Sequence, residues 1–132
     1  MRVFIDTSAL FAFLDKDDQD HSEVVKAWDE LVESKSAFIT TSYVLLETFI
    51  LLQNRLGLAA ARDFHQNIAS LLEVEWVSCE IHDAAVTAVL SAGRKNLSIV
   101  DCVSFNIMRR LDLTRAFSLD AHFREQGFEC VP

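Results

Sequence analysis

At 132 residues, of which 51% are hydrophobic, three are glycine and one is proline, the chain has the size of a single domain over residues 1–132, with no room for a long flexible linker. Three widely spaced cysteines exclude a disulfide framework, and without a basic apolar leader or about 18 uncharged apolar residues in a row we expect a cytoplasmic protein and no membrane segment. The net charge of −8 disfavours a nucleic-acid partner, but residues 81–132 hold 6 acidic and 6 basic groups, whereas residues 1–80 hold 14 and 6.

Short β-type runs alternate with longer helical patterns along the chain. In order, the pattern predicts strand 2–5, helix 8–15, helix 21–34, strand 37–40, helix 42–56, helix 58–72, strand 75–79, helix 81–92, helix 98–111, strand 115–119, helix 121–126 and strand 128–131. Asp20 followed by Glu23 is typical of a helix N-terminus, and Gly57 of a helix C-terminus. The alternation predicts an α/β fold, a three-layer α/β/α sandwich with a central parallel sheet, because parallel strands need crossover connections that cover both faces.

Four acidic residues differ from the rest because their neighbours are strongly apolar. Asp6 ends the strand RVFI, and Asp120 follows the strand RAFSL in the same strand, acid, helix order. Glu47 interrupts the helix YVLLETFILL, and Asp101 lies in SIVDCVSFNIM, near the start of another helix. The carboxyl ends of parallel strands meet at one edge of a sheet. We therefore expect the three aspartates at that edge, where a glutamate from a neighbouring helix can join them.

Each of the four acids also has a purely structural interpretation. Asp6 and Asp120 are suitable helix N-caps. Asp101 lies three residues after Ser98 and can complete a capping box with it. Glu47 can form a buried ion pair with an arginine. The sequence leaves these alternatives open for each acid taken singly.

Together, the four acids indicate a metal site. Four carboxylates in one place cannot all stay ionised without a compensating charge, because like charges raise one another's pKa. A divalent cation removes this repulsion, and ligands that are all oxygen select Mg²⁺ or Mn²⁺. Such a metal activates water for attack on phosphorus, so the pattern predicts phosphodiester hydrolysis.

A bound metal and a local basic rim would also let an acidic protein bind a nucleic acid, because they reverse the sign of the local field. The more basic second part of the chain supplies the candidates for this rim. For each of them, ordinary solvated surface charge is the alternative. The candidates are Arg94, Lys95, Arg109, Arg110 and Arg124.

The segments VFIDTSAL, SYVLLET, SIVDCVSF and FSLDAHFREQGF together resemble the PIN domain, in particular its small VapC-like members. The resemblance covers essentially the entire chain, and its specific part is the order and spacing of the acids. It implies a metal-dependent ribonuclease with a central parallel sheet. The acidic quartet of the family maps to Asp6, Glu47, Asp101 and Asp120, the last at the most variable position. Ser8 and Ser104 match small polar positions found beside the metal.

The same resemblance implies Mg²⁺ or Mn²⁺ as the cofactor, RNA as the substrate, products with 5′-phosphate and 3′-hydroxyl ends, and a homodimer. For a toxin of the VapC type it further implies a cognate antitoxin whose C-terminal segment lies across the active site. Phe11, Phe13 and Trp28 are candidates for the groove that receives this segment, with ordinary core packing as the alternative.

Three other interpretations remain. The chain could be a solitary PIN nuclease without an antitoxin, or a non-catalytic module that keeps the fold and binds through its rim. A phosphatase or phosphotransfer protein built around a strand-end aspartate is disfavoured, because Thr7 and Ser8 follow Asp6 where a DxD motif would be expected, and residues 96–132 contain no lysine.

Overall fold

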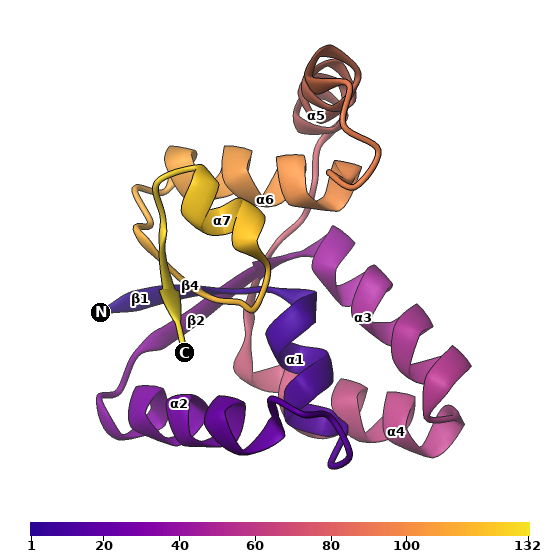
Figure 1. The fold of residues 1–132 in the computed structure, drawn as a ribbon, viewed down its shortest axis with the longest axis vertical. Helices are drawn as coiled ribbons and strands as arrows, with labels where there is room; N and C mark the ends of the chain where they lie inside the picture. The colour runs from indigo at the N-terminus through magenta and orange to yellow at the C-terminus, as the bar shows by residue number, and fades with distance from the viewer.

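A computed structural model describes residues 1–132 and contains a five-stranded sheet in which every neighbouring pair of strands is parallel (Figure 1). The strand order is β3-β2-β1-β4-β5, so β1 lies at the centre. The strands are β1 (Arg2–Ile5), β2 (Ala37–Thr41), β3 (Glu73–Glu75), β4 (Arg115–Phe117) and β5 (Glu129–Val131).

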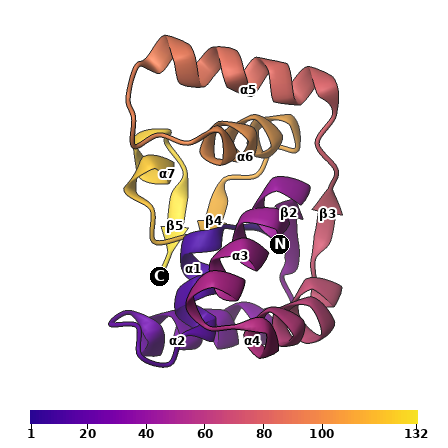
Figure 2. The same cartoon turned by 90° about the vertical axis from the view of Figure 1, so that its right-hand side faces the viewer.

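Helices lie on both sides of this sheet. α1, α2 and α4 lie on one side and α6 and α7 on the other, with α5 packed outside α6 (Figures 1 and 2). α3 follows β2 and contacts both α1 and α6. The helices are α1 (Thr7–Leu14), α2 (His21–Glu33), α3 (Ser42–Arg55), α4 (Leu58–Asp63), α5 (Cys79–Ala92), α6 (Ile99–Arg110) and α7 (Ala121–Glu125). None of them has the combined length and hydrophobicity needed to cross a membrane.

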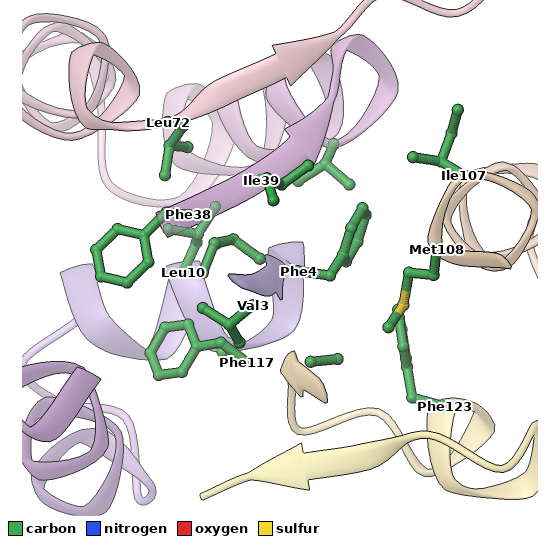
Figure 3. Packing of buried hydrophobic residues seen from close by; sticks show 14 of the residues in the cluster. Val3, Phe4, Leu10, Phe38, Ile39, Leu72, Ile107, Met108, Phe117 and Phe123 are labelled. Carbon is green, nitrogen blue, oxygen red and sulfur yellow. The ribbon is translucent and has the colours of Figure 1, made fainter. Parts of the chain in front are cut away.

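The core is built on the two-residue alternation of the central strands. Val3 and Phe4 are both fully buried but point to opposite faces of the sheet. Val3 lies on the side of α1, beside Phe117, whereas Phe4 points towards α6 and α7 (Figure 3). There its ring lies 6.2 Å from that of Phe123. A strand buried on both faces explains why RVFI is continuously apolar after its first residue.

The predicted α/β/α architecture with a parallel sheet is confirmed, and two elements differ from the sequence prediction. The strand expected at 75–79 ends at Glu75, which pairs with Thr41 at the end of β2; beyond it β2 offers no partner, and Ser78 already caps α5. The single helix expected over 58–72 is α4 followed by a π-helical turn (Phe64–Ile68) and a 3₁₀ turn (Ala69–Leu71).

Candidate active site

Two neighbouring strands position Asp6 and Asp120. β1 pairs with β4, with Ile5 opposite Phe117, and the backbone N–H of Asp6 donates to the Phe117 carbonyl at 3.0 Å. Asp6 is the N-cap of α1, and Asp120 is the N-cap of α7. Both acids therefore lie at the carboxyl edge of the sheet.

Glu47 and Asp101 reach the same edge from helices. Glu47 lies in the second turn of α3, which follows β2 directly, and Asp101 lies in the first turn of α6. All four predicted acids line one cavity of about 370 Å³, which we call the acid cavity. The residues that line it are Asp6, Thr7, Ser8, Glu47, Leu51, Asn96, Ser98, Asp101 and Asp120.

Asp6 has one oxygen held by the protein and one that is free. Its Oδ2 accepts hydrogen bonds from the Ser8 N–H at 3.3 Å, the Ser8 hydroxyl at 2.6 Å and the Ser118 hydroxyl at 2.9 Å. Its Oδ1 accepts none from the protein. Because the residue is only 3% exposed, these donors fix the direction in which the free oxygen points.

Asp101 and Asp120 show the same division between their two oxygens. Asp101 Oδ2 accepts from the Ser98 N–H at 3.1 Å, and the Ser98 hydroxyl accepts from the Asp101 N–H at 3.0 Å, which completes the predicted capping box. Asp120 Oδ1 accepts from the His122 N–H at 2.9 Å. In both residues the second oxygen accepts no hydrogen bond from the protein. Capping therefore leaves one oxygen of each carboxylate without a hydrogen bond from the protein.

Burial and mutual repulsion raise the pKa of three of the four acids. Burial raises the pKa of Asp6 to about 6, although hydroxyl donors oppose the shift, and it also raises the pKa of Asp101 to about 6. The pKa of Glu47 is raised as well, again mainly by burial. The charge of Asp120 adds to the shift in all three cases. A cation in the acid cavity would remove this cost.

The two serines predicted to support the site have different surroundings. Ser8 lines the acid cavity, and besides donating to Asp6 its hydroxyl accepts from the Leu119 N–H at 2.9 Å. Ser104 is fully buried, donates to the Val100 carbonyl at 2.9 Å and does not line the cavity.

Sequence reasoning missed two hydroxyls of the site. Ser118 donates to Asp6 and also accepts from the Asp120 N–H at 3.0 Å, so it joins the two strand ends. Thr7 lines the cavity and accepts from the Thr48 hydroxyl at 3.1 Å. The sequence could have indicated Ser118, because this residue directly follows a strand and lies two residues before a candidate acid.

Sequence reasoning also missed His122. Its Nδ1 lies 2.8 Å from Asp120 Oδ1 and 3.8 Å from Asp101 Oδ2. Donor atoms of these three residues all lie within 4.8 Å of one another. The histidine is the only nitrogen donor in this group, and it lies close to Asp101, which is distant along the chain.

Two of the predicted RNA-contacting residues, Lys95 and Arg124, lie near the acid cavity, and a third, Arg94, is paired with an acid. Lys95 is exposed and adjoins Asn96, which lines the cavity. Arg124 and Asp120 line a neighbouring hollow of about 180 Å³. Arg94 is exposed but forms an ion pair with Glu125 at 2.9 Å, and this pairing raises the pKa of the guanidinium.

The other two basic candidates lie farther away. Arg109 and Arg110 are at the C-terminal end of α6, roughly 12 Å along the helix from Asp101. Arg109 donates to the Gln126 side chain at 2.6 Å, and Arg110 donates to Asn106 at 2.7 Å.

An apolar hollow of about 460 Å³, which we call the apolar groove, adjoins the acid cavity. The two share Glu47 and Leu51 in their linings. Leu46 on α3 is 60% exposed along it. The groove is lined by Tyr43, Leu46, Glu47, Ile50, Leu51, Asn54, His82, Ile99 and Val100.

The aromatic residues suggested from the sequence for a partner groove do not line it. Phe11 and Trp28 are buried in the core, and Phe13 packs on the Trp28 ring at 4.8 Å between centroids. The core alternative is therefore the correct one for these residues, because their rings fill the space between α1, α2 and the sheet.

Comparisons with known proteins agree with this architecture. The chain is 28% identical over 127 residues to the 23S rRNA-specific endonuclease VapC20 of Mycobacterium tuberculosis, in alignments that span 96% of this chain and 95% of that protein. The crystal structure of M. tuberculosis VapC20, described as a sarcin–ricin-loop-cleaving toxin, superposes with a TM-score of 0.84 at 29% identity, covering 98% of this chain and 99% of that one. FitAcB from Neisseria gonorrhoeae shares the fold, with a TM-score of 0.71 at 13% identity over 100% of this chain and 97% of the other. Residues 3–129 match the sequence family described as PIN domain, and the chain therefore belongs to the PIN domain family.

Proposed function

We propose that this chain is a Mg²⁺- or Mn²⁺-dependent endoribonuclease of the VapC type, the toxin of a toxin–antitoxin pair. The observation that carries the proposal is the convergence of Asp6, Glu47, Asp101 and Asp120 on one cavity at the carboxyl edge of the sheet. Membership of the PIN domain family and the full-length similarity to VapC20 support the same activity.

The residues of the acid cavity fit a hard divalent cation. Each of the three aspartates has an oxygen without a protein donor, and the raised pKa values of Asp6, Asp101 and Glu47 reflect a site where uncompensated negative charge is costly. We assign Asp6, Glu47, Asp101 and Asp120 as the residues that hold the metal. When bound, the metal supplies a water activated for attack on phosphorus and neutralises charge on the leaving oxygen.

The remaining residues of the site act by holding these ligands still. Ser8 and Ser118 fix the Asp6 carboxylate, so it does not need to reorient during the reaction. Asp120 would complete the metal site or orient the attacking water. We assign no side chain as a covalent nucleophile. Water would attack phosphorus and the bond from phosphorus to the 3′-oxygen would break, which leaves a 5′-phosphate and a 3′-hydroxyl on the RNA.

RNA is the proposed substrate, and the relative named for 23S rRNA makes a sarcin–ricin-type stem-loop the first sequence to test. Lys95 and Arg124 are the best-positioned phosphate contacts, since both are exposed close to the acid cavity. Arg94, Arg109 and Arg110 remain candidates for more distant contacts.

Two protein partners belong to the proposal, a cognate antitoxin and a second copy of the chain. The apolar groove supports a polypeptide partner, because exposed apolar side chains such as Leu46 and Ile50 gather there. Because the groove shares Glu47 and Leu51 with the acid cavity, a segment lying in it would reach the active site. A short reading frame directly upstream, encoding a DNA-binding protein with an extended tail, would separate a toxin from a solitary nuclease.

The proposal is tested by cleavage of a labelled stem-loop with Mn²⁺ or Mg²⁺. We expect Asp101→Asn to lower the cleavage rate by at least about 100-fold. Loss of a residue that only supports a metal ligand already costs up to about 100-fold, and Asp101 is assigned as a ligand itself. Asp83→Asn, a matched change on the exposed face of α5, should cleave like the wild type. Wild-type cleavage by Asp101→Asn, or cleavage that persists in EDTA, would contradict the proposal. A wild type that binds no metal and cuts no RNA would favour the non-catalytic module.

A further inference from the structure

We propose that His122 is a direct metal ligand through Nδ1, so that the site of this chain selects a divalent transition ion of the Mn²⁺ type over Mg²⁺. This inference rests on the proposed function and adds a nitrogen donor to a site that the sequence presents as all oxygen.

The ring of His122 lies against Asp101 and Asp120, two of the acids that line the acid cavity, although His122 itself is not part of that lining. The side chain is 12% exposed, and Nδ1 itself is shielded from solvent. The capping bond from the His122 N–H to Asp120 Oδ1 anchors the backbone of the residue at 2.9 Å. The backbone of His122 therefore stays beside Asp120 as long as the start of α7 is intact.

Nδ1 lies beside two carboxylates without being hydrogen-bonded to either. It is 2.8 Å from Asp120 Oδ1 and 3.8 Å from Asp101 Oδ2, yet it has no hydrogen-bond partner in the protein. Donors that each lie about 2.1 Å from one octahedral ion are separated by roughly 3 to 4.2 Å. Both separations are measured to the oxygens that accept the capping hydrogen bonds, and they are close to this range, so Nδ1 lies near enough to both carboxylates for one ion to contact all three residues.

The other histidines lack this combination of burial and missing partner. His21 Nδ1 pairs with the Ala12 carbonyl at 2.8 Å, and His82 Nδ1 pairs with the Tyr43 hydroxyl at 2.5 Å. His65 is exposed. Buried polar atoms without a hydrogen-bond partner are uncommon in proteins. A metal ion that binds Nδ1 would explain why this nitrogen has none.

A nitrogen ligand changes which ion the site prefers. Carboxylate oxygens suit Mg²⁺ and Mn²⁺ alike, whereas imidazole is a softer donor that transition ions accept more readily than Mg²⁺ does. Replacing this nitrogen by an oxygen should therefore lower the affinity for Mn²⁺ more than the affinity for Mg²⁺. His122→Asn makes that replacement, because the Asn amide oxygen can occupy the position of Nδ1.

The test compares Mn²⁺ and Mg²⁺ binding by calorimetry in the wild type, His122→Asn and the control His65→Asn. We expect Mn²⁺ to bind the wild type more tightly, and the Mn²⁺-to-Mg²⁺ affinity ratio to fall by at least about tenfold in His122→Asn only. Pulsed electron paramagnetic resonance of the Mn²⁺-loaded wild type should show modulation from a directly bound nitrogen. This second readout needs no variant to fold.

Each alternative outcome has a distinct meaning. A histidine that serves only as a partner for the acids predicts equal changes for both ions and no nitrogen modulation, and that result would overturn the inference while leaving the proposed nuclease intact. If neither ion binds the wild type and no RNA is cut, the proposed function fails together with the inference.

Discussion

The hydroxyl of Ser118 donates to Asp6 Oδ2 at 2.9 Å, which links the end of β4 to the acid that follows β1. The same hydroxyl accepts from the Asp120 N–H at 3.0 Å. One side chain therefore fixes two of the four acids relative to each other. This bond explains how an edge of short strands can hold carboxylates in a defined arrangement.

Removing this hydroxyl should weaken metal binding without unfolding the protein. In Ser118→Ala, Asp6 loses one of its two hydroxyl donors and the Asp120 N–H loses its acceptor. We expect the Mn²⁺ dissociation constant to rise by about tenfold or more, as measured by calorimetry. Ser22→Ala, at an exposed serine on α2, is the control and should bind like the wild type. Unchanged affinity in Ser118→Ala would show that the bond has no role in orienting Asp6.

Neutralising Asp6 should stabilise the metal-free protein. The pKa of Asp6 is raised from 3.8 to about 6, so the folded state favours the protonated acid; this contribution to stability is complete below about pH 4 and is lost as the pH rises through 6. Asp6→Asn avoids the loss, and we expect it to be more stable than the wild type at pH 7 by on the order of 1–3 kcal/mol. Urea unfolding in EDTA at pH 4 and pH 7 measures this. A gain as large at pH 4 as at pH 7 would refute the explanation.

Metal binding should weaken in acid. Asp6 and Asp101 each have a pKa of about 6, so below that pH protons compete with the cation for the same carboxylates. We expect the rise in melting temperature caused by Mn²⁺ to be large at pH 7.5 and small at pH 5. Thermal melts with and without Mn²⁺ at both values provide the measurement. A pH-independent rise would mean that the ion binds elsewhere.

A charge in the apolar groove should disrupt a homodimer that uses this surface. Leu46 is 60% exposed on α3, and a glutamate there would carry its charge into an apolar interface. We expect light scattering to give twice the chain mass of 14.9 kDa for the wild type and the single mass for Leu46→Glu. Val32→Glu, a matched change at an exposed residue of α2, should remain dimeric. A wild-type monomer, or a dimer that tolerates Leu46→Glu, would remove the groove as the dimer interface.

The sequence is sufficient to predict the fold class and the edge where the acids lie. Asp6 and Asp120 each follow an apolar strand and precede a helix, and that local order fixes their position once the sheet is parallel. The capping box of Asp101 is equally local, because it depends on residues three apart. Such features need no knowledge of distant contacts.

The parts that could not be predicted depend on contacts between distant segments. The strand expected at 75–79 ends at Glu75 because its neighbour β2 ends there, which only the register reveals. His122 follows Asp120 by two residues, but its significance comes from Asp101, 21 positions earlier, whose carboxylate lies 3.8 Å from its ring. Hydrophobic patterns carry no information about such side-chain proximity.

The most direct test of the central claim is an anomalous-scattering map from crystals of the wild-type protein grown with Mn²⁺. We expect a peak in the acid cavity, within about 2.2 Å of carboxylate oxygens from at least two of the four acids, and no such peak in Asp101→Asn. An empty cavity in the wild type, in a protein that still cleaves RNA with Mn²⁺ in solution, would contradict the claim.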